Sequence, residues 1–282
     1  MLNTILAKGR TAVITGGASG IGLASARGFA SLGMNIVLAD LDSEALNEAQ
    51  FELWGVIADG AEVLTVPTDV SRKEDLEHLR DAALAKFGDV AVLMNNAAIN
   101  AGSGKPWQDA DRWRQVIDVN LMGVVHGVTA FTESMIAQSQ PSHIINTGSK
   151  QGITNPPGAA AYNTSKAAVR ALTEQLAFAL ASDAPHVSAH LLIPGWTYTT
   201  LTGATESSAK PDGAWTPAQV VEFMLESLGR GDFYILCPDN SVTRAVDERR
   251  MQWTADDIIR NRPALSRWRP DHMEAFARFM AE

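Results

Sequence analysis

A glycine-rich turn between an expected strand and an expected helix constrains the fold of this chain more than any other feature. Residues 11–15 form a short β-type run, and residues 23–32 carry a helical pattern that ends at Gly33. Between them lies Thr15-Gly-Gly-Ala-Ser-Gly-Ile-Gly22. Its glycines permit a tight turn and a close approach of the backbone to a pyrophosphate, to which the helix N-terminus offers N–H donors. The G-x-x-x-G-x-G spacing therefore predicts a dinucleotide site, with a purely structural glycine turn as the alternative.

Strands and helices alternate along the rest of the chain. We expect further strands at residues 35–40, 62–67, 90–94, 143–149, 187–193 and 233–236, and helices at 42–58, 72–87, 110–138, 160–181 and 217–228. The alternation predicts a Rossmann-like, doubly wound α/β fold, in which a mostly parallel seven-stranded sheet carries helices on both faces. The 282 residues, 46% of them hydrophobic, suffice for one large domain, which we place at residues 1–237.

Ligands of such sheets bind beyond the carboxyl ends of the strands. Glycine, proline or polar residues lie at the carboxyl ends of six expected strands, namely Gly16–Gly22, Asp40, Asp69, Asn96, Ser149 and Pro194. We therefore expect these residues to meet at one edge of the sheet. Asp69 is placed there to reach an adenine amino group, and an acid that only closes a turn is the alternative.

Asp40 ends the second expected strand, 18 residues beyond Gly22. An acid near this position accepts a hydrogen bond from a ribose 2′-hydroxyl, and its charge repels a 2′-phosphate. No Lys or Arg lies between Thr15 and Gly22 to bind such a phosphate. The sequence therefore favours NAD over NADP, with a helix-capping or loop acid as the alternative role of Asp40, although Asp42 could also cap that helix.

Two residues within the helix expected at 110–138 are unfavourable in the interior of a helix. Asn120 and Gly123 both have low helix propensity, and they lie three residues apart. Local conflicts of this kind are expected where a helix is kinked or carries function.

Tyr162 and Lys166 lie four residues apart at the start of a long apolar run, residues 167–181. On a helix this spacing places the phenol and the ammonium on one face, one turn apart. A nearby positive charge favours the phenolate, so we expect the pKa of Tyr162 to fall toward the range of an acid/base catalyst.

Composition excludes several other classes of protein. The net charge of −9 and the lack of a dense Lys/Arg stripe argue against nucleic-acid or anionic-membrane partners. No apolar run is long enough to span a membrane, no signal peptide is recognisable, and the six histidines lack metal-ligand spacing. Cys237 is the only cysteine, which suits a reducing compartment such as the cytoplasm.

Together these marks resemble the short-chain dehydrogenase/reductase family, in its single-domain subgroup. The resemblance covers about residues 8–237 and rests on Thr15-Gly16-x-x-x-Gly20-x-Gly22, Asn95-Asn96-Ala97, Asn120, Ser149, Tyr162-x-x-x-Lys166 and Pro194-Gly195. Ala98 stands where the family usually has Gly, and Gly148 stands where many members have a second Ser.

The resemblance implies an NAD(P)-dependent enzyme that interconverts a secondary alcohol and a ketone. Tyr162 would exchange a proton with the substrate oxygen, and Ser149 would orient that oxygen. Lys166 would bind the nicotinamide ribose and lower the tyrosine pKa, while Asn120 would bind a water that relays protons. The implied cofactor contacts are Gly16, Ser19, Gly20, Ile21, Gly22, Asp40, Asp69, Val70, Asn96, Tyr162, Lys166, Pro194, Gly195, Thr197 and Thr199.

The family also implies a homo-oligomer, a tetramer or a dimer, assembled through the helices at 110–138 and 160–181. Two other readings remain: a non-catalytic NAD-binding regulator on the same fold, and a sugar-nucleotide epimerase or dehydratase. The epimerase reading lacks its usual G-x-x-G-x-x-G turn and larger C-terminal domain. The sequence leaves the substrate open, from an alicyclic, aromatic or steroid-like alcohol to a small polyol, and we expect a mixed pocket formed by Trp196, Tyr198, Ile153, Asn155 and Thr200.

A C-terminal extension, residues 238–282, follows the last expected strand. Residues 244–270 contain seven Arg, and Met273, Phe276 and Phe279 form one apolar face of a helix. We expect the extension to pack over the mouth of the active site or on a neighbouring subunit, with a solvated helix and strap as the alternative.

Overall fold

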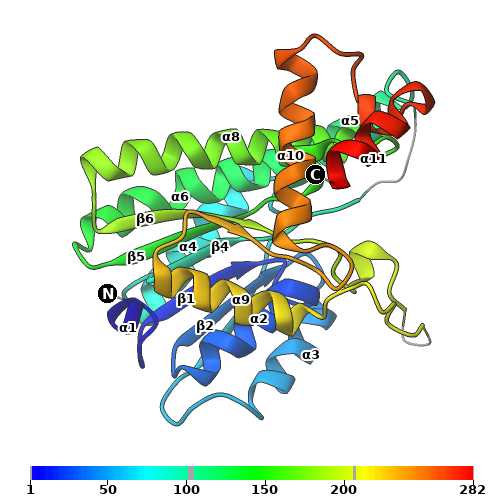
Figure 1. Ribbon diagram of the computed structural model, residues 1–282. Coiled ribbons are helices and arrows are strands. Elements are labelled where there is room, and N and C mark those ends of the chain that lie inside the picture. Colours follow the sequence, from blue (N-terminus) through cyan, green and yellow to red (C-terminus); the bar gives the residue numbers. More distant parts are fainter. Residues whose placement is uncertain (1, 101–104, 206–207, 282) are drawn as a thin grey trace.

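The computed structural model describes residues 2–100, 105–205 and 208–281 (Figure 1). In this part of the chain one sheet contains seven strands in the order β3-β2-β1-β4-β5-β6-β7, and every neighbouring pair is parallel. The strands are β1 (Thr11–Thr15), β2 (Asn35–Asp40), β3 (Val63–Pro67), β4 (Val92–Asn95), β5 (Ser142–Thr147), β6 (Val187–Ile193) and β7 (Tyr234–Leu236). The predicted doubly wound sheet is therefore confirmed, and β6 has the predicted bounds.

Helices cover both faces of the sheet (Figure 1). They are α1 (Leu2–Ile5), α2 (Gly20–Ser31), α3 (Ser43–Leu53), α4 (Lys73–Phe87), α5 (Ala110–Ile117), α6 (Gly123–Ala137), α7 (Gln151–Thr154), α8 (Ala160–Asp183), α9 (Pro217–Arg230), α10 (Arg244–Ile259) and α11 (Met273–Ala281). The short helical turns are η1 (Asp118–Met122), η2 (Thr200–Thr202), η3 (Ser266–Trp268) and η4 (Pro270–His272). No helix of the described residues is both long and apolar enough to cross a membrane.

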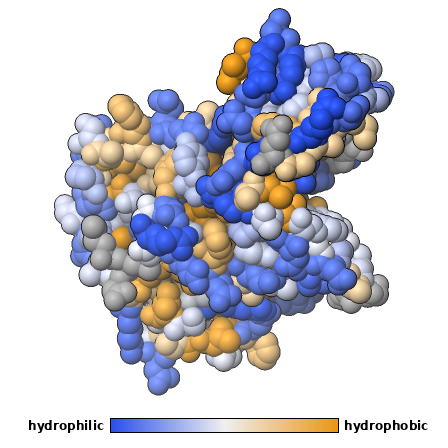
Figure 2. Space-filling model, in the orientation of Figure 1, coloured by the Kyte–Doolittle hydropathy of each residue, from blue (hydrophilic) through white to orange (hydrophobic). Residues whose placement is uncertain are grey.

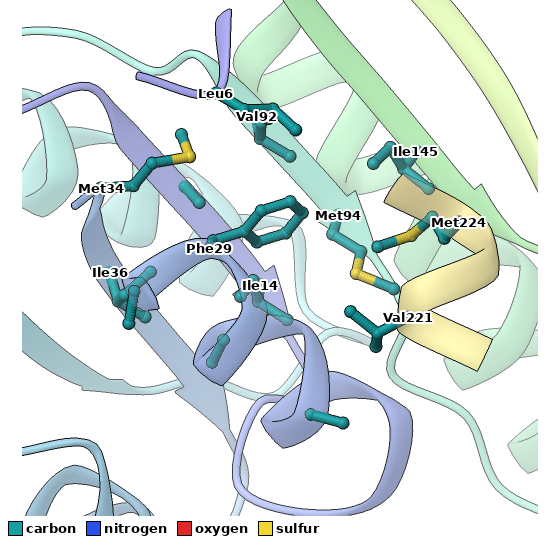
Figure 3. Packing of buried hydrophobic residues seen from close by; sticks show 14 of the residues in the cluster. Leu6, Ile14, Phe29, Met34, Ile36, Val92, Met94, Ile145, Val221 and Met224 are labelled. Atoms are coloured by element: carbon teal, nitrogen blue, oxygen red, sulfur yellow. The ribbon is translucent and has the colours of Figure 1, made fainter. Parts of the chain in front are cut away.

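Two apolar clusters flank the sheet. One joins the sheet to α2, α3 and α9, and the other joins it to α4, α6 and α8. Figure 3 shows the ring of Phe29 on α2 between Ile14 of β1 and Val92 of β4, with Met94 of β4 and Val221 and Met224 of α9 to one side. Because both faces are covered, every residue of β1, β4 and β5 is buried, as expected for central parallel strands.

The single helix predicted at residues 110–138 is wrong in detail. The structure divides it into α5, the π-helical turn η1 and α6, and the break contains Asn120. A Cβ on Gly123 would lie 2.8 Å from Cγ2 of Val70, so this helix packs against the turn after β3 only because residue 123 is glycine. The local conflict at Asn120 and Gly123 thus marks a real irregularity.

Arg72 occupies the N-cap position of α4, where its side chain makes no capping hydrogen bond to the described residues. The Ser71 hydroxyl donates to Asp69 Oδ1 at 2.7 Å and is used within the turn after β3. Gly88 ends α4 as predicted, with a left-handed backbone at φ 82°.

The C-terminal extension forms a separate layer of helices. Figure 1 shows α10 standing across the sheet edge with α11 beside it, and Figure 2 shows a hollow between this extension and the rest of the molecule. Trp253 of α10 is buried in the extension, where its ring lies 5.3 Å from both Phe276 and Phe279 and its Nε1 donates to Ser266 Oγ at 2.8 Å. Met251 packs against the main body, in a cluster with Val124 and other core residues, so α10 joins the two parts.

Candidate active site

A cavity of about 710 Å³ opens at the carboxyl ends of the strands, where the sequence predicts a ligand. The catalytic and cofactor residues predicted from the sequence line this cavity, except Gly22 and Asn120. The structure therefore brings together side chains that lie up to 183 positions apart, from Gly16 to Thr199.

The glycine turn has the geometry of a cradle. Gly16 and Gly20 have left-handed backbones, at φ 64° and 54°, which favour glycine. A Cβ on Gly22 would lie 2.0 Å from the carbonyl oxygen of Gly16, so Gly22 lets α2 begin directly against the turn. The Ser19 side chain makes no capping bond to the described residues, and Ser19, Gly20 and Ile21 line the cavity. This cradle fits a pyrophosphate.

Asp40 faces the glycine turn from the end of β2. Its Oδ2 accepts the Ala18 N–H at 3.1 Å, and its Oδ1 accepts the Leu41 N–H at 2.8 Å. The cap of α3 is Asp42, which accepts from the N–H groups of Glu44 and Ala45. The alternative role of Asp40 as a helix cap is therefore excluded, and its carboxylate lies at the cavity wall.

The turns after β3 and β4 complete the predicted cofactor side. Asp69 Oδ1 accepts from both the N–H and the hydroxyl of Ser71, so Asp69 closes its turn and also lines the cavity, as does Val70. Asn96 Nδ2 donates to the carbonyls of Thr15 and Gly16 at 3.2 and 3.3 Å. The amide of Asn96 thus fixes the glycine turn to the end of β4.

Tyr162 and Lys166 both lie on α8 and line the cavity, as the spacing predicts. Lys166 is buried, its Nζ donates to the Thr147 carbonyl at 2.8 Å, and this nitrogen lies 5.8 Å from the centroid of the Tyr162 ring. Burial lowers the pKa of Lys166 to about 8, because desolvation disfavours the ammonium.

The expectation of a lowered pKa for Tyr162 is wrong. Burial raises the pKa of Tyr162 above its ordinary value, and the hydrogen bond with the Ser149 side chain opposes this rise only in part. Desolvation of the phenolate therefore outweighs the hydrogen bond with Ser149, while the Lys166 Nζ is directed at Thr147.

Asn120 lies behind the cavity and not on its wall. Its Nδ2 donates to the Ile99 carbonyl at 2.9 Å and to Ser165 Oγ at 3.2 Å, and its Oδ1 accepts the Ile99 N–H at 2.8 Å. Both amide donors are thus used within the protein, which leaves the second lone pair of Oδ1 for the predicted water. The side chain fixes the chain after β4 to α8.

The loop after β6 forms a further part of the wall. Pro194, Gly195, Thr197 and Thr199 line the cavity as predicted, and Thr199 lies against Gly20, since a Cβ on Gly20 would be 3.2 Å from Cγ2 of Thr199. Trp196 and Thr200 of the predicted substrate pocket also line the cavity, whereas Tyr198, Ile153 and Asn155 do not. The Tyr198 hydroxyl bonds Ser208 instead.

Several lining residues escaped the sequence analysis. They include Leu41, Ile99, Lys150, Gln151, Leu201 and Thr202. The only residue of the 150–152 segment whose type could have indicated a close contact is Gly152. In the structure a Cβ on Gly152 would lie 2.6 Å from the carbonyl carbon of Lys166. This contact seats α7 on α8 and brings Ser149 to Tyr162, and only glycine permits it.

The chain matches the family model described as short chain dehydrogenase over residues 10–210. It is 35% identical over 248 residues to 1-deoxy-11-beta-hydroxypentalenate dehydrogenase of Streptomyces exfoliatus, a match that covers 86% of this chain and 88% of the relative. Among solved structures it is similar to a short-chain dehydrogenase/reductase of Burkholderia phymatum in complex with NAD, with a TM-score of 0.81, 35% identity, and coverage of 91% of this chain and 96% of that chain.

An alcohol dehydrogenase of the archaeon Thermococcus sibiricus, complexed with 5-hydroxy-NADP, is similar with a TM-score of 0.74 and 27% identity, over 83% of this chain and 98% of that chain. The solved relatives therefore include proteins with either nicotinamide cofactor. The family model, the extent of the sequence identity and the shared fold together assign the function class. The chain is an oxidoreductase that belongs to the short-chain dehydrogenase/reductase family.

Proposed function

We propose that this enzyme interconverts a secondary alcohol and a ketone by hydride transfer, with NAD as its preferred cofactor and Tyr162 as the acid/base. The observation that carries the proposal is the meeting of Ser149, Tyr162 and Lys166 at a cavity that the glycine cradle also lines. The relatives named as a hydroxypentalenate dehydrogenase and an alcohol dehydrogenase support a hydroxyl group as the reacting centre.

NAD preference rests on Asp40. Its carboxylate lies at the end of β2 beside the glycine turn, where it would accept a hydrogen bond from a ribose 2′-hydroxyl and repel a 2′-phosphate. The glycine cradle would hold the pyrophosphate, and Lys166 would hold the nicotinamide ribose. When bound, the oxidised cofactor would accept the hydride and bring a positive charge into the site.

The side chains of this protein would carry the proton chemistry. In the oxidation direction, Tyr162 as phenolate would take the proton of the alcohol, and Ser149 would hydrogen-bond the substrate oxygen and keep it beside Tyr162. Because burial raises the pKa of Tyr162, we propose that the phenol reaches its working range only when Lys166 and the bound cofactor add positive charge. In the reduction direction the same phenol would protonate the oxygen on which charge develops.

Replacing the phenol tests this proposal. We expect Tyr162→Phe to lower kcat by about 10²- to 10⁴-fold, the range typical of losing a general acid/base, while the Kd for NADH changes little. The matched control is Tyr234→Phe, which removes a half-exposed phenol that bonds Glu174 and does not line the cavity. Turnover by Tyr162→Phe at the wild-type rate would overturn the assignment of the acid/base.

Three features of the wider molecule remain predictions. We propose that residues 1–237 form the catalytic domain and residues 238–282 an extension of it, and we retain the cytoplasm as the compartment.

For the homo-oligomer, the 81% exposed Phe178 on α8 supports an interface on that helix. Light scattering on Phe178→Glu should show a smaller particle than the wild type.

A further inference from the structure

Lys150 joins three segments of the chain at the wall of the cavity. It directly follows Ser149, and its backbone N–H donates to the Pro194 carbonyl at 3.3 Å. Its Nζ lies 2.6 Å from Oδ2 of Asp247 on α10 and 3.3 Å from Oδ2 of Asp239. The side chain of Lys150 is 15% exposed and those of Asp239 and Asp247 are each 5% exposed, so the three form a buried ion cluster, the Lys150 cluster.

Asp239 also contacts the loop after β6. Its Oδ2 accepts the Trp196 N–H at 3.2 Å, and its Oδ1 accepts the Ser241 N–H at 3.0 Å. A Cβ on Gly195 would lie 2.6 Å from this Oδ2 and 3.0 Å from Lys150 Nζ, so the cluster packs directly on the Gly195 backbone. One carboxylate therefore touches both Lys150 and the backbone that carries Trp196.

These contacts connect the extension to two parts of the candidate active site. The first is the Ser149–Gln151 turn, where Ser149 meets Tyr162, and the second is the Gly195–Trp196 wall. Both acids of the cluster belong to residues 238–282. The extension therefore reaches the cavity through buried charge and not through a loose surface contact.

We infer that Lys150 is a positioning residue, and that through Asp239 and Asp247 the C-terminal extension sets the placement of Ser149 and Trp196 around the substrate oxygen. The inference rests on the proposed function, because it assigns Ser149 the task of holding that oxygen. Burial of three ions is costly unless each is paired in good geometry, so a cluster of this kind specifies an arrangement more than it adds stability. Burial raises the pKa of Asp247, whereas Lys150 and, to a smaller extent, Arg250 favour its ionised form.

Lys150→Met tests the inference, because it keeps the unbranched stem of the side chain and removes its charged end. We expect the variant to bind NADH within twofold of the wild type, while kcat/KM for NAD-linked oxidation of 1-phenylethanol or cyclohexanol falls at least tenfold. With the Ser149 hydrogen bond weakened, the pKa of Tyr162 should rise and the pH profile of kcat should move to higher pH. Lys150→Arg, which keeps the charge, should recover most of the loss.

A second variant, Asp247→Asn, removes the carboxylate charge that pairs with Lys150. Its matched control is Glu248→Gln, which removes one carboxylate charge at the next residue. Glu248 is exposed and pairs with Arg244, away from the cavity. We expect wild-type kinetics from this variant and a tenfold loss of kcat/KM from Asp247→Asn. If Lys150→Met does not fold, Asp247→Asn decides, since it keeps Asp239. Unchanged kinetics and an unchanged pH profile in Lys150→Met or Asp247→Asn would overturn the inference.

Failure of the proposed function is recognised separately. If the wild type binds NADH but oxidises no alcohol, the proposed reaction falls, and hydrogen exchange then decides the role of the cluster. Faster amide exchange at residues 149–152 and 196 in Lys150→Met, but not in Glu248→Gln, supports positioning. Equal exchange in the two variants overturns it.

Discussion

The two ends of the cavity are built by different means. At the cofactor end, the wall is mostly backbone: the Gly16–Gly22 turn and the ends of β2 and β4. At the end proposed for the substrate, the wall includes side chains held by contacts between distant segments. Lys150, for example, lines the cavity and meets Asp247 of α10 at 2.6 Å across 97 positions of sequence. A site made of backbone leaves a local glycine pattern, whereas a site made of side-chain pairs leaves none.

This difference has a consequence for variation. The glycine cradle tolerates little change, because an added Cβ strikes the turn itself. The substrate end depends on the position of the extension, which can change without altering the cofactor site. An enzyme built in this way can keep one cofactor while its substrate wall is rearranged.

The largest effect on stability that we expect comes from Lys166, which lies in the wall of the cavity. Burial lowers its pKa from 10.5 to about 8, so between these values the unfolded chain holds a proton that the folded protein has released. Stability from this group therefore rises with pH across that window, and below pH 8 the buried ammonium destabilises the fold by about 3 kcal/mol. We expect Lys166→Met to be inactive yet more stable than the wild type at pH 7. The gain in stability is reduced by the loss of the hydrogen bond from Lys166 to the Thr147 carbonyl.

Urea melts of both proteins between pH 7 and pH 10.5 measure this gap directly. The advantage of Lys166→Met should shrink as pH rises from about 8 to 10.5. Taking the difference cancels the opposite slope from Cys237, whose pKa burial raises to about 12. Lys86→Met, at an exposed lysine paired with Glu62, is the control. A gap that stays constant with pH would show that Lys166 is not desolvated.

Gly22→Ala tests the claim that the cofactor end is backbone-built. Its Cβ would lie 2.0 Å from the Gly16 carbonyl oxygen, so the turn must move. We expect the Kd for NADH to rise at least about a hundredfold, or about 2.7 kcal/mol, in a fluorescence titration. Gly55→Ala serves as the control, because its Cβ would meet only the Glu52 carbonyl at an ordinary 3.4 Å. Wild-type affinity in Gly22→Ala would mean that the cradle does not bind the cofactor.

The same contrast explains what the sequence could and could not predict. The parallel sheet could be predicted from the alternation of strand and helix patterns. The glycine turn could be predicted from the glycines themselves, because they permit a tight turn between a strand and a helix. The π-helical turn η1 was visible only as a local conflict, because Gly123, which follows it, packs on Val70, 53 positions away in the sequence. The Lys150 cluster gave no local signal, and the rise in the pKa of Tyr162 depends on burial, which no spacing of residues encodes.

Asp40→Ala should change cofactor choice without changing the fold. We expect the wild type to bind NADH at least about tenfold tighter than NADPH, or about 1.4 kcal/mol, and the variant to lose this preference. Asp42→Ala removes the same charge two residues away and costs α3 its cap, about 1 kcal/mol of stability, while keeping the preference. A wild type that binds both nucleotides equally would refute NAD preference, and an unchanged preference in Asp40→Ala would move its origin elsewhere.

The smallest effect concerns the substrate end and reaches it through the extension. Trp253 packs between Phe276 and Phe279, with the Arg262 guanidinium 3.8 Å from the centroid of its ring, so it holds α10 and α11 together. Trp253→Ala should loosen this packing and, through Asp247, the Lys150 cluster. We expect KM for the alcohol to rise about fivefold, or about 1 kcal/mol, with NADH binding unchanged. Trp54→Ala, at a 60% exposed tryptophan beside α3, is the control. If the affinity for NADH fell while KM rose, the two ends of the cavity would be coupled, and the extension would not act on the substrate end alone.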